Sequence, residues 1–338
     1  MNCSKKILVI ILNPDAASSR IRVLNLLPEL DTAGLEVEVE VYPKTFRDKL
    51  RLFRKCRGFN LVVLQKKMPS PFDLFLLRKN CRKLGYDFDD AQHLPHDSKG
   101  SKSRSREVKF RNVIQASDFV IAGNRILEGW AREFGAIKTY VIPSAVETRN
   151  IAVKTEYTLG RRFVIGWVGG RVNLPHLMML APVLQALQSA DIPVELRIVS
   201  DDTVEIPGVQ VDMRRWDIET QEKEIAQFDV GVMPLPDTLH SAGKCAYKAI
   251  QYMASAVPVV ASDVGVNRDV VKDGPGFAAI DSGEFINYLA ELYGSEMLRK
   301  KCGGAGRLRA EKEFSNESVG ALLAACLNDH LTEKGIKL

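Results

Sequence analysis

The stretch GKCAYKAIQYMASAVPVVASDVGVNRDVV, residues 243–271, decides the fold of this chain. It begins with a glycine, continues into a helical pattern and closes on the apolar run PVVAS at 258–262. Gly243 lets backbone N–H groups approach a ligand, and a helix start there offers unpaired donors and partial positive charge. Lys244 and Lys248 add formal charge. The stretch predicts a phosphate-binding loop between two parallel strands, although a surface helix with ordinary lysines has the same pattern.

On both sides of this stretch, short apolar runs alternate with amphipathic helical patterns. Runs of strand length fall at 6–12, 36–42, 59–65, 85–91, 118–123 and 138–146, then at 162–169, 194–200, 209–216, 229–235, 258–262 and 276–280. The helical patterns between them include 19–34, closed by Gly34, and 174–190. Strands at this spacing with helices between them indicate parallel βαβ units. We therefore predict an α/β protein of two Rossmann-like domains that face each other across a cleft.

The polar segment 147–160 has no apolar period and is typical of a linker. We predict an N-terminal, acceptor-side domain over 1–150 and a C-terminal, nucleotide-sugar-binding domain over 155–314. A final helix is predicted over 315–331, with Ser315 as its N-cap, and we expect it to pack back on the first domain.

Charge is distributed unevenly along the 338 residues, whose net charge is +5. Residues 1–140 contain 26 Lys and Arg against 16 Asp and Glu, whereas the remainder contains 21 against 26. A basic half favours an anionic partner, such as a membrane face or a phosphorylated substrate, although an ordinary solvated face has the same composition. Aromatic residues are sparse in the basic runs, so we expect no nucleic-acid partner.

The six cysteines form no CxxC pair and no cluster with histidine, which fits reduced thiols and indicates neither a zinc site nor a disulfide framework. The first apolar run, 7–12, is too short for a spanning helix or a signal peptide. We expect a cytoplasmic protein. No GxGxxG follows the first strand and no GxxxxGK[ST] occurs, which argues against a dehydrogenase and a P-loop protein.

Several of these segments resemble one family. QYMASAVPVVASDVGVNRDVV (251–271) is similar to the donor-phosphate segment of GT-B-fold retaining glycosyltransferases of the family 4 group. GWVGGRVN (166–173) resembles the first strand and phosphate loop of their donor domain. Residues 118–148 and 14–30 resemble the end and the first loop of their acceptor domain. The resemblance covers nearly the whole chain and implies transfer of a sugar from a nucleotide-diphosphate donor.

The resemblance also implies binding residues. For the donor these are Gly169, Gly170, Arg171, Asp237, Gly243, Lys244, Cys245, Lys248 and Gln251, and for the acceptor they are Ser19 and Arg20. Two departures mark a divergent branch. Gly243 and Gln251 stand where many family members have glutamates, and the lysine that usually follows Arg171 falls near Pro175 and His176. We expect Lys244 and Lys248 to supply the diphosphate charge.

Asp89 and Asp90 align with a His-Asp pair of the family, and together with His93 they are the predicted catalytic residues. A carboxylate there would orient an acceptor hydroxyl or take its proton. Asp87-Phe88-Asp89 also matches the DxD that holds a metal in another glycosyltransferase fold. Because two Rossmann-like halves contradict that fold, we expect no metal and no cofactor.

The function implied is a retaining hexosyltransferase-type glycosyltransferase at the inner face of the membrane, acting on a sugar or lipid-linked acceptor in surface polysaccharide or lipopolysaccharide synthesis. The basic N-terminal half would contact that membrane peripherally. Two alternatives stay open: a UDP-sugar 2-epimerase on the same scaffold, and a non-catalytic nucleotide-sugar-binding protein. The absence of the usual glutamates at Gly243 and Gln251 keeps the second one plausible.

Overall fold

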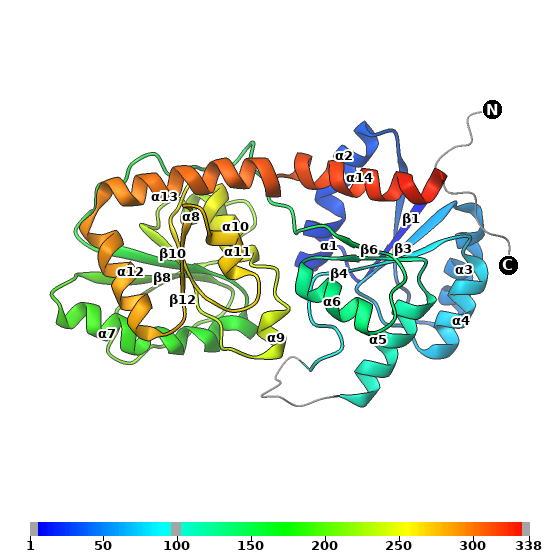
Figure 1. Ribbon diagram of the computed structural model, residues 1–338, viewed down its shortest axis with the longest axis horizontal. Coiled ribbons are helices and arrows are strands. Elements are labelled where there is room, and N and C mark those ends of the chain that lie inside the picture. The colour runs from blue at the N-terminus through cyan, green and yellow to red at the C-terminus, as the bar shows by residue number, and fades with distance from the viewer. Residues whose placement is uncertain (1–5, 96–102, 333–338) are drawn as a thin grey trace. The chain divides into compact units, whose positions relative to one another are not determined.

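The computed structural model describes residues 6–95 and 103–332, which form two compact units (Figure 1). Unit 1 comprises Met1–Ala145, Thr238–Cys245 and Asn316–Leu338, and unit 2 comprises Val146–Asp237 and Ala246–Ser315. Unit 2 thus begins at Val146 rather than at residue 155, and it lacks residues 238–245, which belong to unit 1.

Unit 1 contains a six-stranded sheet in the order β2-β1-β3-β4-β5-β6, and every neighbouring pair is parallel. Its strands are β1 (Lys6–Ile11), β2 (Glu36–Val41), β3 (Leu61–Gln65), β4 (Leu84–Phe88), β5 (Phe119–Ala122) and β6 (Thr139–Val141). The central strands are continuous apolar runs because helices cover both faces of the sheet.

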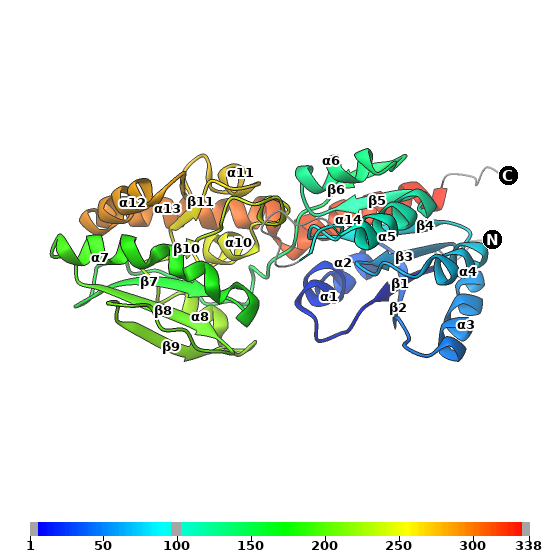
Figure 2. The same ribbon diagram turned by 90° about the horizontal axis from the view of Figure 1, so that it is seen from below.

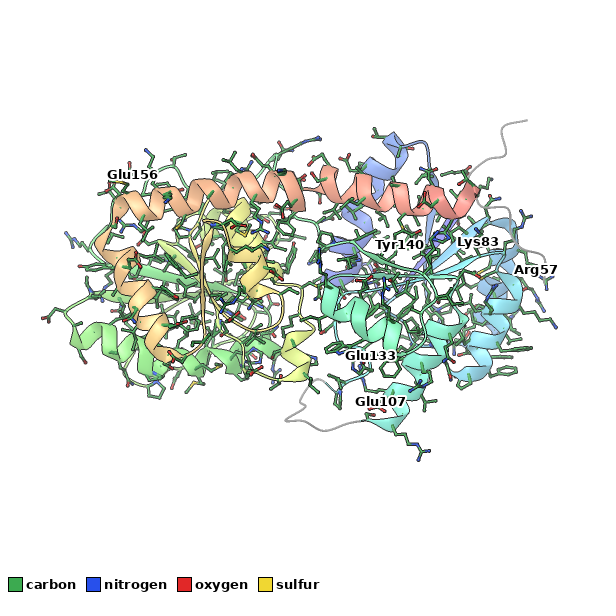
Figure 3. The ribbon with its side chains drawn as sticks, viewed as in Figure 1. Arg57, Lys83, Glu107, Glu133, Tyr140 and Glu156 are labelled. Atoms are coloured by element: carbon green, nitrogen blue, oxygen red, sulfur yellow. The ribbon has the colours of Figure 1, made fainter. Side chains whose placement is uncertain are left out.

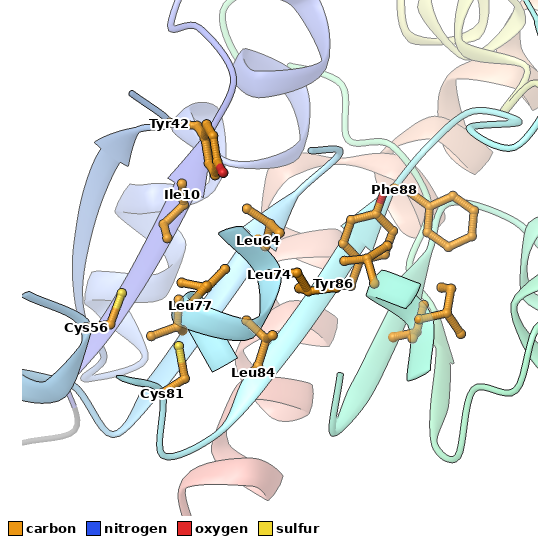
Figure 4. Close-up of a cluster of buried hydrophobic side chains, with 14 of the residues drawn as sticks. Ile10, Tyr42, Cys56, Leu64, Leu74, Leu77, Cys81, Leu84, Tyr86 and Phe88 are labelled. Atoms are coloured by element: carbon orange, nitrogen blue, oxygen red, sulfur yellow. The ribbon is translucent and has the colours of Figure 1, made fainter. Parts of the chain in front are cut away.

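The helices of unit 1 are α1 (Ala17–Arg22), η1 (Leu24–Leu26), α2 (Leu27–Thr32), α3 (Phe46–Lys55), η2 (Cys56–Gly58), α4 (Pro71–Asn80), α5 (Arg104–Ala116), α6 (Arg125–Glu133), α9 (Leu239–Ala242) and α14 (Asn316–Thr332). Those from α3 to α6 cover one face, where Leu74 and Leu77 of α4 pack with Leu64 and Tyr86 of the sheet (Figure 4). α2 and α14 pack side by side over the other face (Figure 1).

The single helix predicted over 19–34 is wrong, since the chain forms three short helical pieces there. Val23 leaves the helical region with a φ of −131°, and Pro28 restarts the helix at the beginning of α2. Proline fits only the first turn of a helix, because it lacks an N–H and clashes with the preceding turn. Gly34 ends the last piece with a φ of 73°, as the sequence indicated.

Unit 2 contains a second parallel sheet of six strands, in the order β12-β11-β10-β7-β8-β9 (Figure 2). Its strands are β7 (Phe163–Val168), β8 (Val194–Ser200), β9 (Val211–Arg215), β10 (Val230–Met233), β11 (Val259–Ser262) and β12 (Gly276–Ala279). Its helices are η3 (Arg171–Leu180), α7 (Ala181–Ser189), α8 (Gln221–Ile225), α10 (Tyr247–Ala254), α11 (Asn267–Val271), α12 (Ser282–Gly294), α13 (Glu296–Arg309) and the π-helix η4 (Ala310–Phe314). The predicted helix 174–190 is thus a 3-10 helix containing Pro175, followed by a shorter α-helix.

The last helix, α14, belongs to unit 1. His330 of α14 stacks on Phe119 with ring centroids 3.8 Å apart, and its Nε2 lies 3.2 Å from the hydroxyl of Tyr140. Gly320 lies against Glu29 of α2, where a Cβ would come within 2.5 Å of the glutamate side chain. Over residues 6–95 and 103–332, no helix combines the length and apolar character needed to cross a bilayer.

Candidate functional site

Each sheet has one point where the strand order reverses. In unit 2 the chain proceeds from β7 to β8 and β9 and then crosses to β10, on the other side of β7. In unit 1 the corresponding reversal lies between β1 and β3. Ligands of open parallel sheets bind beyond the carboxyl ends of the strands at such switch points. The carboxyl ends of the strands at these two switch points are therefore the candidate ligand sites.

A buried tyrosine shapes the switch point of unit 2. Gly166 of β7 and Gly231 of β10 face each other in register, and they leave room for the rings of Phe228 and Tyr252. The Tyr252 hydroxyl accepts from the N–H of Val168 at 3.1 Å and donates to the carbonyl of Val232 at 3.3 Å. The backbone pairing of β7 and β10 ends at Gly166 and Gly231. Beyond these residues, the Tyr252 hydroxyl bridges the carboxyl ends of the two strands.

Gly169 and Gly170, which the resemblance assigns to a phosphate loop, follow β7 directly. A Cβ on Gly169 would come within 2.7 Å of Cε of Lys248 and of the Trp167 ring, whereas one on Gly170 would meet nothing within 4 Å. The ammonium of Lys248 lies 5.3 Å from the centroid of the Trp167 ring. Lys248 of α10 and the loop after β7 are therefore neighbours, which places a cation beside the start of η3.

The remaining predicted donor residues of unit 2 have separate surroundings. Arg171 is exposed and pairs with Asp202 at 3.1 Å, after the end of β8. Gln251 donates from Nε2 to Oε1 of Gln221 at 3.4 Å, and the same oxygen accepts from the indole of Trp216 at 3.0 Å. Asp237 is an exposed residue of the loop after β10.

The other three predicted donor residues, Gly243, Lys244 and Cys245, belong to unit 1. The Asn124 side chain, which caps α6, donates to the carbonyls of Gly243 at 3.2 Å and Lys244 at 3.1 Å. Gly243 has no space for a Cβ, since Trp130 and Ala91 would lie within 3.0 Å of it. Residue 243 is therefore a glycine because it packs against Trp130 and Ala91 within unit 1, and helix α10 begins only at Tyr247.

Asp89 and Asp90 lie together at the carboxyl end of β4, beside residues that the sequence analysis did not single out. Lys66 Nζ lies 2.9 Å from Asp89 and 4.0 Å from Asp90, and His240 Nε2 lies 3.8 Å from Asp90. Burial alone would raise the pKa of Asp89, but the charges of Lys66 and Arg22 outweigh burial and lower it. Asp89 is therefore an ionised carboxylate in a basic surrounding.

Cys245, the last residue of the 238–245 segment, contacts Asp89. Its thiol donates to the carbonyl of Asp89 at 3.2 Å, and its Sγ would lie 2.5 Å from a Cβ on Gly123. Burial and the charge of Asp89 raise the pKa of the Cys245 thiol to about 12. The residue is therefore a neutral packing and hydrogen-bonding group, and not a thiolate nucleophile.

His93 lies among aromatic rings. Its ring centroid is 4.8 Å from that of Trp130 and 5.3 Å from those of Phe110 and Phe134. Burial lowers its pKa, and Nδ1 has no hydrogen-bond partner within the described residues. These surroundings favour a neutral imidazole that packs at the end of α5 and α6, and its catalytic role stays a prediction.

The predicted acceptor residues lie at the switch point of unit 1. Ser19 is fully buried and donates to Oε1 of Gln65 at 3.4 Å, and Arg20 donates to the carbonyl of Asp15 at 2.6 Å. Beneath them, Arg22 binds both oxygens of Asp87 from Nε at 3.1 and 3.0 Å. Asp87 of the DxD alternative is thus engaged by an arginine, and no group of three or more potential metal ligands occurs among residues 6–95 and 103–332.

Comparison with known proteins gives a partial family-model match and a shared fold. Residues 162–295 match the family model described as glycosyl transferases group 1. No curated protein matches the chain.

Solved structures cover almost the whole chain. The sucrose-phosphate synthase of Thermosynechococcus elongatus superposes with a TM-score of 0.73 at 16% identity, covering 98% of this chain and 100% of that one. A glycosyltransferase from Rickettsia africae gives 0.73 at 13% identity with the same coverage. Anabaena HepE in complex with UDP and glucose gives 0.70 at 13% identity, covering 96% and 99%. The two-sheet α/β fold of GT-B glycosyltransferases is confirmed, whereas membership of family 4 stays a prediction.

Proposed function

We propose that this chain is a glycosyltransferase that moves a hexose from a nucleotide-diphosphate donor to a hydroxyl acceptor with retention of configuration. The observation that carries the proposal is the switch point of unit 2, where Gly169, Gly170 and Lys248 lie together within the segment that matches the glycosyl transferases group 1 model. Unit 2 would bind the donor, and unit 1 would bind the acceptor.

Donor binding would rest on charge and on open backbone. The start of η3 presents N–H groups after Gly170, and such groups favour anions. Lys248 adds a full positive charge beside the same loop. In a transfer reaction the bond between the anomeric carbon and the diphosphate oxygen breaks, and the negative charge that develops on that oxygen would be stabilised by these donors.

Acceptor binding would rest on Asp89 and Asp90. Because Lys66 and Arg22 lower the pKa of Asp89, its carboxylate is a weak base. We therefore assign it to orienting the acceptor hydroxyl through a hydrogen bond, while the departing diphosphate takes the proton. Lys66 and His240 would hold the two carboxylates in place.

Finer features of the proposal concern the substrate and the setting. The reaction would need no metal and no cofactor, since Lys248 and the η3 start supply positive charge at the diphosphate. A UDP-sugar is the first donor to test, because HepE was solved with UDP and glucose. A sugar or lipid-linked acceptor at a membrane face would fit the basic composition of residues 1–140 and would place the enzyme in surface polysaccharide or lipopolysaccharide synthesis.

The test combines binding and turnover. Thermal-shift titration with UDP, GDP, ADP and TDP sugars should identify one donor, because a ligand of the native state raises Tm by mass action. Lys248→Ala should weaken binding of that donor roughly ten- to hundredfold, as loss of about 1.5–3 kcal/mol from one charged hydrogen bond implies. Lys300→Ala, an exposed position on α13, is the matched control and should leave binding unchanged.

The alternatives give different results in the same assays. Donor epimerisation without any acceptor would identify a UDP-sugar 2-epimerase. Tight donor binding without turnover, over a panel of sugar and lipid acceptors, would identify a non-catalytic binding protein. Full donor affinity in Lys248→Ala would contradict the assigned donor site.

A further inference from the structure

Unit 1 carries three exposed phenylalanines on adjacent helices. Phe46 begins α3 and stacks on Phe72 of α4, with ring centroids 6.1 Å apart and an interplanar angle of 25°. Phe75 lies one turn further along α4. The three side chains are 53%, 59% and 61% exposed. Large aromatic residues that gather on a surface mark a binding face, whereas single ones need no explanation. We call these three residues the aromatic surface.

Positive charge surrounds the aromatic surface. Residues 44–82 contain 12 Lys and Arg but only two acidic residues. Lys44, Arg47 and Lys79 are exposed beside the phenylalanines, and the ammonium of Lys79 lies 5.9 Å from the centroid of the Phe75 ring.

The two acidic residues of this segment are both engaged locally. Asp48 pairs with Arg51 at 3.1 Å, and Asp73 pairs with Lys49 at 2.8 Å. Helix α5 contains one acidic residue, Glu107 (Figure 3). Other basic residues of the segment pair outside it, Lys55 with Glu38 and Glu40, and Arg78 with Asp118. The positive charge beside the phenylalanines is therefore that of Lys44, Arg47 and Lys79.

Two further basic residues lie beside the ring of Tyr42. Lys67 follows β3, and its ammonium lies 4.9 Å from the centroid of the Tyr42 ring. Lys49 of α3 lies 5.7 Å from the same ring. Burial, together with the charges of Lys49 and Lys109, lowers the pKa of Lys67. Asp73, which pairs with Lys49, partly offsets this positive charge.

We propose that the aromatic surface docks unit 1 on a lipid bilayer with anionic headgroups. Phenylalanine partitions into the boundary between headgroups and acyl chains, while lysine and arginine stay at the headgroup level and attract anionic lipid. A second copy of this chain is a poorer occupant, because two surfaces with the same excess of positive charge repel each other. Charge complementarity therefore selects the anionic bilayer.

This inference extends the acceptor class of the proposed function by giving the surface that would reach a lipid-linked acceptor. The inference rests on the proposed function for the role of bilayer binding, but bilayer binding itself is measured without turnover. Loss of vesicle binding in a variant that still glycosylates a soluble acceptor separates the docking surface from the catalytic site.

The test uses the full chain and sedimentation with vesicles of phosphatidylglycerol and phosphatidylethanolamine, compared with vesicles of phosphatidylcholine alone. We expect binding to the first kind only, with affinity falling as salt rises. The double variant Phe72→Ser with Phe75→Ser should bind at least tenfold more weakly. The matched control is Met297→Ser with Leu308→Ser, since these unit 2 side chains are 81% and 69% exposed.

Three outcomes would overturn the proposal. The first is equal vesicle binding by the phenylalanine double variant and the unaltered chain. The second is equal binding to anionic and phosphatidylcholine vesicles, and the third is concentration-dependent dimerisation through the aromatic surface without vesicle binding. Because the substituted side chains are more than half exposed, circular dichroism should show the same fold in every variant. The charge variant Lys44→Gln with Arg47→Gln should reduce binding to anionic vesicles without changing the fold.

Discussion

The hydroxyl of Tyr252 offers a direct test of how unit 2 is held open at its switch point. Tyr252→Phe removes one oxygen atom and leaves the ring, which packs against Phe228 at a centroid distance of 6.1 Å. The N–H of Val168 then loses its acceptor, and the carbonyl of Val232 loses its donor. Both groups lie beside fully buried side chains at the carboxyl ends of β7 and β10, so water replaces neither bond easily.

The magnitude follows from these two bonds. A buried polar group that loses its partner costs about 1–3 kcal/mol. The Val168 N–H can make only one hydrogen bond, so leaving it unpaired costs more than leaving the Val232 carbonyl without this donor. We expect unit 2 to be destabilised by about 2 kcal/mol. The loop that contains Gly169 and Gly170 should also open more often, because its anchor at Val168 is weakened.

Two measurements check this prediction. Urea unfolding, followed by near-UV signals of unit 2, gives the loss of stability. Hydrogen exchange with mass spectrometry gives the protection of the peptide that contains Val168. Tyr288→Phe, at a partly exposed position on α12, is the control and should change stability by less than about 0.5 kcal/mol. Unchanged protection of the Val168 peptide in Tyr252→Phe would refute the bridging role.

Three further predictions concern unit 2. Asp191 has a φ of 59° at the position after α7 where helices favour glycine. Asp191→Gly should raise the free energy of unfolding by about 1 kcal/mol and raise Tm by about 2–4 °C in calorimetry. Asp191→Ala keeps the Cβ and should raise the free energy of unfolding by less. Burial and the charge of Glu147 raise the pKa of Glu222, so ionisation of this carboxyl destabilises the folded state as pH rises above about 4.3. In urea titration, Glu222→Gln should be more stable than the unaltered chain at pH 7 and equal to it near pH 3.5. A Cβ at Gly166 would lie 1.9 Å from the Phe228 ring, so Gly166→Ala should cost about 1–3 kcal/mol, and an unchanged urea midpoint would contradict this packing.

The strands and most helices were predictable because their signals are local. The run VELRIVS was predicted as a strand over 194–200, and β8 has those bounds. Apolar alternation and Gly34 need no knowledge of distant residues. The division into α1, η1 and α2 was missed because the apolar period runs through all three without a gap. The break at Val23 lies in its backbone conformation, which the apolar period does not show.

The site was less predictable because its residues meet through distant contacts. Asn124 holds Gly243 and Lys244 from 119 and 120 residues away, and no local pattern in the sequence indicates such a contact. Lys66 directly follows a buried strand, as Asp89 does, and this position was the signal that could have singled it out. His240 gave no such signal, since its distance to Asp90 follows from the packing of the 238–245 segment.

The return of α14 to unit 1 has a consequence for synthesis of the chain. The sheet of unit 1 is complete at Val141, but Val319 and Leu327 of α14 cover one face of it and leave the ribosome nearly two hundred residues later. Until then, α2 covers part of that face, and the part that α14 covers is exposed while unit 2 is translated and folds. The nascent chain therefore passes through a long interval in which a chaperone has a hydrophobic surface to bind. Unit 1 folds to completion last, although its first strand is made first.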